Sequence, residues 1–268
     1  MRAMETSIDP LRMIHDLDSS RKRAILKVQT KTLNVMVSEL VRKGFEWILP
    51  VTLAKSTDPL WPDPGASIEK RIEFDIYDER VRTIQSMIIQ KLVLASLGPE
   101  KFFIISPNIR IESRKRAGTG WHLYEFTQLE TEISGGKMHD VFRVYEELII
   151  AAMKAVQDDV SRLRNTELNI PEAPFRVRSR NELQQEYGEV ISGAEREYEY
   201  PKIVKKLDRD GVRKEDYAFL LSLAKDGKLK PSAGAGLGFE RFIAYLCGVK
   251  HVAEVQPFPR IPGMVPPV

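Results

Sequence analysis

The stretch that decides the fold is HLYEFTQLETEI, residues 122–133 of a chain of 268 residues. From Glu125 onward its residues alternate in the way that side chains alternate between the two faces of a strand. One face then carries an aromatic ring followed by three polar side chains, Phe126, Gln128, Glu130 and Glu132. Two interpretations of this face are open. Alternation alone favours a solvent-exposed sheet surface, and the other is the floor of a binding site, where the ring stacks on a planar group.

A basic segment precedes this strand. Arg110 and Glu112 are two residues apart and share a face of an extended chain, and the loop RKRAGTG follows at residues 114–120. Cationic side chains beside a glycine-containing loop suit an anionic ligand such as a nucleotide phosphate. A surface hairpin with a solvated tip is the alternative.

A second glycine-rich stretch, GAGLGFER, covers residues 234–241. We expect a loop over 232–238 and a helix over 239–247. The stretch lacks the Lys-Ser/Thr ending of a phosphate-binding loop, and too little chain follows it for a dinucleotide-binding half-domain. Glycines let a flat ligand approach the backbone, and Arg241 could then meet a base or a phosphate. A tight helix-packing turn is the alternative.

The remaining pattern mixes helices and strands without the regular spacing of βαβ units, which favours a mostly antiparallel α+β sheet. We interpret the first twenty residues as a tail or docking segment. Apolar spacing and turn residues predict helices over 21–43, 85–97, 137–156, 201–207 and 214–224, and strands over 45–51, 72–76, 80–82, 102–105 and 187–196.

Composition excludes several classes of protein. Hydrophobic residues make up 43% of the chain and charged residues 29%, and 41 basic residues against 38 acidic ones leave a net charge of +3. This balance is typical of a globular protein without a nucleic-acid-binding coat. The single cysteine, Cys247, excludes an internal disulfide and indicates a reducing compartment. No apolar run reaches the ~18 residues of a membrane span or forms a secretory signal, so we expect a cytoplasmic protein.

Two cations stand in unfavourable surroundings. Lys91 lies in the apolar run MIIQKLVLA, and Arg196 ends the segment ISGAER. Each needs an acidic partner or a path along which its side chain reaches water. The four histidines have no paired metal-ligand spacing.

The order of these segments is more specific than any one of them. A helix and strand ending at Pro50, RIE at 110–112, HLYEFTQLETE, ISGAER and GAGLGFER together resemble the three motifs of class II aminoacyl-tRNA synthetase catalytic domains, in the subgroup for aspartate, asparagine and lysine. Further segments resemble archaeal asparagine synthetases, which are related to aspartyl- and asparaginyl-tRNA synthetases. These segments are TDPLWPDP, SPNIRIESR, GAEREYEY and KHVAEVQPFPRIPG.

The resemblance covers residues 21–263 and implies an α+β fold, a class II synthetase-like antiparallel sheet of six to seven strands flanked by helices. It implies one catalytic domain over 21–268 after a tail at 1–20, and a homodimer formed through residues 21–51. About twenty residues precede the first helix, so we expect no anticodon-binding barrel and consider tRNA an unlikely partner.

The resemblance also implies roles for single residues. Arg110 and Arg241 are the expected catalytic residues, with Arg110 on the α-phosphate of ATP and Arg241 covering an adenine that stacks on Phe126. The expected ATP-binding set is Arg110, Glu112, His122, Phe126, Glu189, Gly236, Gly238 and Arg241, with Glu189 also at a magnesium position. The expected aspartate-binding set is Gln85, Ser86, Lys91, Gln128, Glu130, Ser192 and Arg196.

Two cations that converge on a substrate suit a dicarboxylate better than an amide, because an unpaired buried charge costs several kcal/mol. We therefore expect an ATP- and Mg²⁺-dependent asparagine synthetase that forms aspartyl-adenylate, releases AMP and pyrophosphate, and uses ammonia for amidation. One alternative is the catalytic core of an asparaginyl- or aspartyl-tRNA ligase without its anticodon-binding domain. The other is a non-catalytic regulatory paralogue, favoured by the short segment before Gly188.

Overall fold

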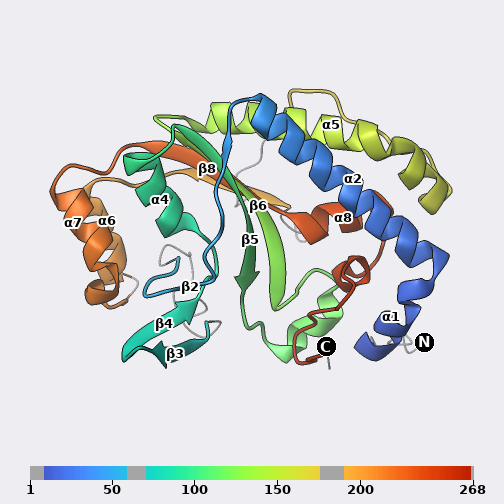
Figure 1. Cartoon of the computed structure of the whole chain (residues 1–268), viewed down its shortest axis with the longest axis horizontal. Coiled ribbons are helices and arrows are strands. Elements are labelled where there is room, and N and C mark those ends of the chain that lie inside the picture. The colour runs from blue at the N-terminus through green and yellow to red at the C-terminus, as the bar shows by residue number, and fades with distance from the viewer. Residues whose placement is uncertain (1–8, 59–70, 176–189, 210, 267–268) are drawn as a thin grey trace.

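A five-stranded sheet organises the chain in the computed structural model, which describes residues 9–58, 71–175, 190–209 and 211–266 (Figure 1). Its strand order is β1-β5-β6-β8-β7. The β1–β5 pair is parallel and the other pairs are antiparallel. The strands are β1 (Glu46–Trp47), β5 (Lys101–Ile109), β6 (Glu125–Ser134), β8 (Ser232–Gly238) and β7 (Ile191–Glu195). The antiparallel-rich α+β fold that the sequence predicts is confirmed.

Three helices cover one face of this sheet. In Figure 1, α2 (Ser20–Arg42) and α5 (Met138–Arg164) lie side by side across it, and α8 (Phe239–Cys247) follows directly from β8. Their apolar stripes and the inward residues of the strands form the main core, which includes the fully buried Met36, Leu148 and Leu237. Ser19 is the N-cap of α2, and its hydroxyl accepts a hydrogen bond from Lys22 N, as an N-cap side chain does.

The other face packs against α4 (Ile88–Leu97), which in turn contacts α6 (Tyr200–Arg209) and α7 (Ala218–Lys225) through a separate apolar cluster. A second sheet has the order β2-β4-β3. Its strands are β2 (Leu53–Ala54), β4 (Glu79–Thr83) and β3 (Glu73–Ile76). Short helices complete the described part of the chain: α1 (Pro10–His15), η1 (Asp16–Asp18), η2 (Arg114–Thr119), η4 (Lys214–Tyr217) and η5 (Val252–Val255).

The expectation of a glycine-rich loop over 232–238 is wrong, because these residues form the buried strand β8. Ala233, Ala235 and Leu237 alternate toward the helical core. The glycines face β6 so closely that a Cβ on Gly234 would lie 2.0 Å from Glu132 Oε2. A neighbour that fills the space of the missing side chains explains a strand with loop-like composition.

Other boundaries also differ from the sequence-based expectation. Within the predicted strand 45–51, only Glu46–Trp47 pairs with another strand, and it does so at the edge of the sheet. The two faces of the segment 45–51 are not both covered, since Leu49 is 80% exposed. β5 continues to Ile109 and α5 to Arg164, beyond the predicted ends. The predicted helix over 21–43 and the hairpin of β3 and β4 are confirmed.

The N-terminal segment has structure where it is described. Residues 10–18 form α1 and η1, and Met13 packs against the main core. None of the helices in the described ranges combines the length and the apolar character needed to cross a membrane.

Candidate functional site

A cleft opens where β5, β6, β7 and β8 meet the start of α8, and nine of the predicted site residues line it. They are Arg110, Glu112, His122, Phe126, Gln128, Ser192, Gly236, Gly238 and Arg241. The sheet register explains this convergence, because β6 pairs with β5 on one side and with the glycine strand β8 on the other. Side chains of β6 and the bare backbone of β8 therefore form a continuous floor.

Arg110 is a half-buried cation of this cleft. Its Nε donates to the carbonyl oxygen of Gln85 at 3.0 Å, and its guanidinium carbon lies 5.1 Å from the centroid of the Phe126 ring. Burial lowers the pKa of Arg110, and the carboxylates of Asp58, Glu130 and Glu112 oppose that shift. A guanidinium stays charged even so. The cleft therefore offers a positive charge, held over an aromatic ring, to an anionic ligand.

Arg241 and His122 also line the cleft. Arg241 Nε donates to the carbonyl oxygen of Trp121 at 3.1 Å. His122 Nε2 lies 2.7 Å from Arg116 Nη1, and its Nδ1 lies 2.7 Å from the Thr119 hydroxyl. Glu112 contacts Arg116 at 3.3 Å. Arg110 and Arg241 thus bring two positive charges to one cleft beside a glycine backbone, an arrangement suited to phosphates.

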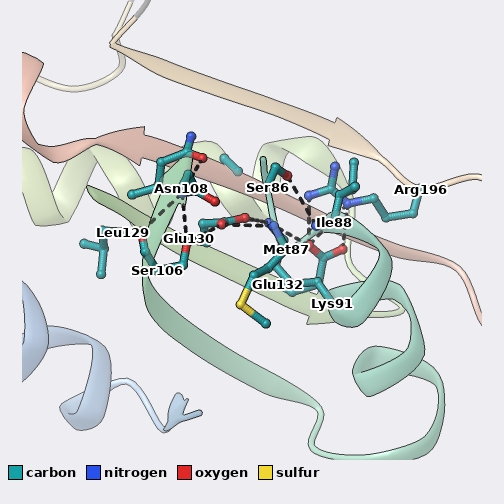
Figure 2. A network of polar contacts seen from close by, with 12 residues as sticks. Ser86, Met87, Ile88, Lys91, Ser106, Asn108, Leu129, Glu130, Glu132 and Arg196 are labelled. Atoms are coloured by element: carbon teal, nitrogen blue, oxygen red, sulfur yellow. Dashed lines mark hydrogen bonds and ion pairs between the residues drawn. The ribbon is translucent and has the colours of Figure 1, made fainter. Parts of the chain in front are cut away.

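Next to the cleft lies a buried polar cluster, which we define as Lys91, Ser106, Asn108, Glu130, Glu132 and Arg196 (Figure 2). Lys91 Nζ lies 2.8 Å from a Glu130 carboxylate oxygen and 3.6 Å from one of Glu132. Arg196 donates to both oxygens of Glu132, through Nε at 2.9 Å and Nη2 at 2.8 Å. Glu132 is fully buried, so these contacts are strong charge-assisted hydrogen bonds.

Hydrogen bonds connect this cluster to the cleft. The Ser106 hydroxyl donates to Glu130 at 2.7 Å, and Asn108 Nδ2 donates to Gln128 Oε1 at 3.0 Å. Gln128 itself lines the cleft. A ligand that reaches past Gln128 therefore meets a preorganised set of buried donors and acceptors.

The charges of the cluster are balanced. Lys91 and Arg196 converge, since both contact Glu132, but Glu130 and Glu132 supply two negative charges. Burial would raise the pKa of Glu130, yet the charge and hydrogen bond of Lys91, with hydrogen bonds from Ser106 and Met87 N, hold it below its usual value. The argument that two unpaired cations select a dicarboxylate over an amide therefore does not hold in this structure.

The other predicted site residues lie at the edges of this arrangement. Gln85 and Ser86 are buried just before α4, where the Ser86 hydroxyl accepts from Ile88 N at 3.3 Å. Glu189, the expected magnesium ligand, lies outside the described residues. Among the residues that are described, no group of three or more His, Cys, Asp or Glu side chains could hold a metal ion.

Sequence reasoning missed Ser106 and Asn108 as members of the site. The predicted strand stopped at Ile105, whereas β5 runs to Ile109. Extending the alternation by two steps would have placed both side chains on the face of β5 that leads to Arg110.

Glu240 was also missed, although it lines the cleft beside Arg241. Its carboxylate accepts from Thr127 N at 3.0 and 2.9 Å and from Gln256 Nε2 at 3.3 Å. It thereby ties the start of α8 to β6, next to Phe126. Burial raises the pKa of Glu240, and these hydrogen bonds oppose the shift only in part.

The raised pKa of Glu240 predicts the sign of one pH effect. The native state holds this proton at a higher pH than the unfolded state does, so the carboxyl's contribution to stability falls as pH rises from its ordinary pKa through its raised native pKa. We expect Glu240→Gln to remove that fall. Urea unfolding of both proteins at several pH values across this window measures it, and parallel pH profiles would contradict the assignment.

Sequence comparison places these features among known proteins. The chain matches the family model described as tRNA synthetases class II (D, K and N) over residues 9–180 and 166–262. It is 26% identical to the asparagine–tRNA ligase of Thermococcus kodakarensis, over 96% of this chain and 73% of that protein. It is 40% identical to the asparagine–tRNA ligase of Streptococcus mutans, over 37% of this chain and 22% of that protein.

Solved structures show the same fold. The asparaginyl-tRNA synthetase of Pyrococcus horikoshii complexed with asparaginyl-adenylate aligns with a TM-score of 0.78 at 21% identity, over 98% of this chain and 75% of that one. A putative aspartyl-tRNA synthetase from Leishmania major aligns with a TM-score of 0.73 at 15% identity, over 98% and 70%. Because the relatives are named as tRNA ligases, the expectation that tRNA is an unlikely partner is not supported.

Proposed function

The chain belongs to the class II tRNA synthetases of the D, K and N type, and from this we propose that it is an AMP-forming ligase that adenylates aspartate or asparagine. One observation carries the proposal: the cleft with Arg110, Phe126 and Arg241 is joined through Gln128 to the buried polar cluster. The cleft suits a nucleotide, and the cluster suits a small amino acid with polar groups at both ends.

In the proposed reaction a carboxylate oxygen of the amino acid attacks the α-phosphorus of ATP, and the bond from that phosphorus to the bridging oxygen of pyrophosphate breaks. The products are an aminoacyl-adenylate and pyrophosphate. Such a step needs alignment of the reactants and stabilisation of developing negative charge more than proton transfer. Arg110 and Arg241 line the cleft and supply that charge, and Phe126 offers a stacking surface for the purine.

Mg²⁺ is part of the proposal as a partner of the ATP phosphates. When bound, it would neutralise phosphate charge. Glu189 is its proposed ligand, on the strength of the family resemblance alone.

Two pairs of amino acid and acceptor, asparagine with tRNA and aspartate with ammonia, are supported by different observations. The relatives named asparagine–tRNA ligase favour asparagine and transfer to tRNA. The balanced polar cluster agrees with a neutral amide, because Glu130 can accept from an amide N–H and Lys91 or Arg196 can donate to its carbonyl. This is the first candidate.

The second candidate is activation of aspartate followed by amidation with ammonia, as in an asparagine synthetase. The segments SPNIRIESR and KHVAEVQPFPRIPG favour it, since they resemble archaeal asparagine synthetases. The convergence of Lys91 and Arg196 on one place also allows a carboxylate there if the substrate displaces part of the hydrogen bonding to Glu132.

ATP–pyrophosphate exchange with aspartate or asparagine tests the shared proposal and identifies the amino acid. Incubation of the active amino acid, radiolabelled, with ATP and either ammonia or tRNA then identifies the acceptor. Asparagine-dependent exchange with labelled tRNA supports the first candidate, and aspartate-dependent exchange with free labelled asparagine supports the second. Tight ATP binding without exchange under saturating Mg²⁺ would contradict both and favour the regulatory paralogue.

The proposed assembly is a homodimer through residues 21–51. This segment leaves apolar side chains open to solvent at the end of α2, in β1 and after it, namely Val41, Trp47, Leu49 and Val51. Exposed apolar side chains gathered in one segment of the chain favour an interaction surface there.

A charge placed in this surface should break the dimer. We expect Leu49→Asp to shift the chain from dimer to monomer in sedimentation velocity, because a buried unpaired carboxylate disfavours the interface. Phe219→Asp is the matched control, since Phe219 is 65% exposed on α7, outside the segment. A wild-type monomer, or dissociation caused by Phe219→Asp alone, would contradict the assignment.

A further inference from the structure

We infer that Thr57 is a positioning residue that holds Arg110 in the cleft through the backbone of Gln85; the inference rests on the proposed role of Arg110 in binding ATP. The contact runs in two steps. Gln85 N donates to Thr57 Oγ1 at 3.0 Å, and the carbonyl oxygen of Gln85 accepts from Arg110 Nε at 3.0 Å. The hydroxyl of one residue thus fixes the orientation of the backbone group that fixes the guanidinium.

The backbone of Gln85 needs such support because of where it lies. It falls between the end of β4 at Thr83 and the start of α4 at Ile88, outside the hydrogen-bond ladders of both. Its N–H is buried and takes the Thr57 hydroxyl as its acceptor. A buried N–H that loses its acceptor is strongly unfavourable, so the backbone would turn to find another one. The Gln85 carbonyl, and with it Arg110, would turn too.

Thr57 is itself held in place by contacts with a distant segment of the chain. It is 1% exposed, and its carbonyl oxygen accepts from the Tyr217 hydroxyl at 2.8 Å. Two residues earlier, the carbonyl oxygen of Lys55 accepts from Arg82, which also binds Asp216 at 2.5 Å. Both anchors, Tyr217 and Asp216, belong to η4, which leads directly into α7. The position of Thr57, and through it that of Arg110, therefore depends on η4 and on the packing of α6 and α7 around it.

The same segment also brings charge to the site. Burial lowers the pKa of Arg110, and Asp58, the residue after Thr57, is the strongest opposing charge. A shift of this short segment would therefore change both the position of the guanidinium and its electrostatic surroundings.

The test measures the affinity of an unreactive ATP analogue, α,β-methylene ATP, by calorimetry, with thermal unfolding recorded for each variant. Thr57→Val keeps the shape and removes the acceptor, and we expect it to weaken binding about tenfold. Thr57→Ser keeps the hydroxyl and should bind nearly as the wild type does. Thr32→Val is the matched control. Thr32 is buried in α2, and its hydroxyl has no hydrogen-bond partner within the described residues.

A double-variant cycle separates positioning from a general structural effect. If Thr57 acts through Arg110, Thr57→Val should cause no further loss of affinity in an Arg110→Ala background. Additive losses, or no loss in Thr57→Val alone, would overturn the inference while leaving the role of Arg110 intact. If Arg110→Ala itself binds the analogue as the wild type does, the proposed function is wrong. Should Thr57→Val lose its folding transition, Tyr217→Phe replaces it, with the same dependence on Arg110 expected.

Discussion

Replacing Arg110 with alanine is expected to lower the rate of ATP–pyrophosphate exchange about 10²-fold or more. Arg110 is half-buried, and its guanidinium is held by the Gln85 carbonyl and lies over Phe126 in the cleft. Removing one preorganised group that stabilises transition-state charge has an effect of this order. Initial rates at saturating ATP and amino acid measure it, because the loss should appear in kcat as well as in kcat/KM.

The control for this experiment is Arg162→Ala. Arg162 lies in the last turn of α5, its side chain is 76% exposed, and it contacts only acidic and backbone groups of its own helix among the contacts that the structure gives it. Its removal should leave the exchange rate unchanged. Thermal unfolding of both variants shows whether the chain remains folded. Exchange near the wild-type rate in folded Arg110→Ala would show that the cleft has been assigned wrongly.

The part of the site on β6 could be predicted from the sequence, because it depends only on the alternation of neighbouring side chains along one strand. Alternation places Gln128, Glu130 and Glu132 on one face, and the structure joins all three to the cleft or the buried polar cluster. The interpretation of that face as a solvent-exposed surface is wrong, since Glu130 and Glu132 are buried. Alternation shows on which face of a strand a side chain lies, but not what covers that face. Here α4 covers it.

The pairing of charges could not be predicted, because it depends on contacts between distant segments. Lys91 reaches Glu132 because α4 packs against β6, and Arg196, which follows β7, reaches it through the order β6-β8-β7. That order requires residues 232–238 to be a strand, and their glycines indicate a loop to any local analysis. One wrong element therefore hid both the glycine floor of the cleft and the partner of Arg196.

The pairing predicts the largest effect on stability. We expect Glu132→Gln to lower the free energy of unfolding by about 3–5 kcal/mol, the usual range when one partner of a buried ion pair is removed. Glu132 accepts three hydrogen bonds from Arg196 and one from Ser232, and it lies near Lys91. The carboxylate fills the space beside Gly234, where a Cβ would lie 2.0 Å from Oε2, so the glutamine amide would stand among the same groups. Urea denaturation measures the loss.

Two further variants show whether the loss comes from uncompensated charge. Asp208→Asn removes a carboxylate from the exposed pair with Lys214, and it should have no comparable effect because exposed pairs contribute little. The double variant Glu132→Gln with Arg196→Gln should recover part of the stability, since it removes the cation that the first change leaves unpaired while Lys91 keeps Glu130. If the two losses simply add, the residues are not coupled, and the charge balance of this cluster is not what stabilises it.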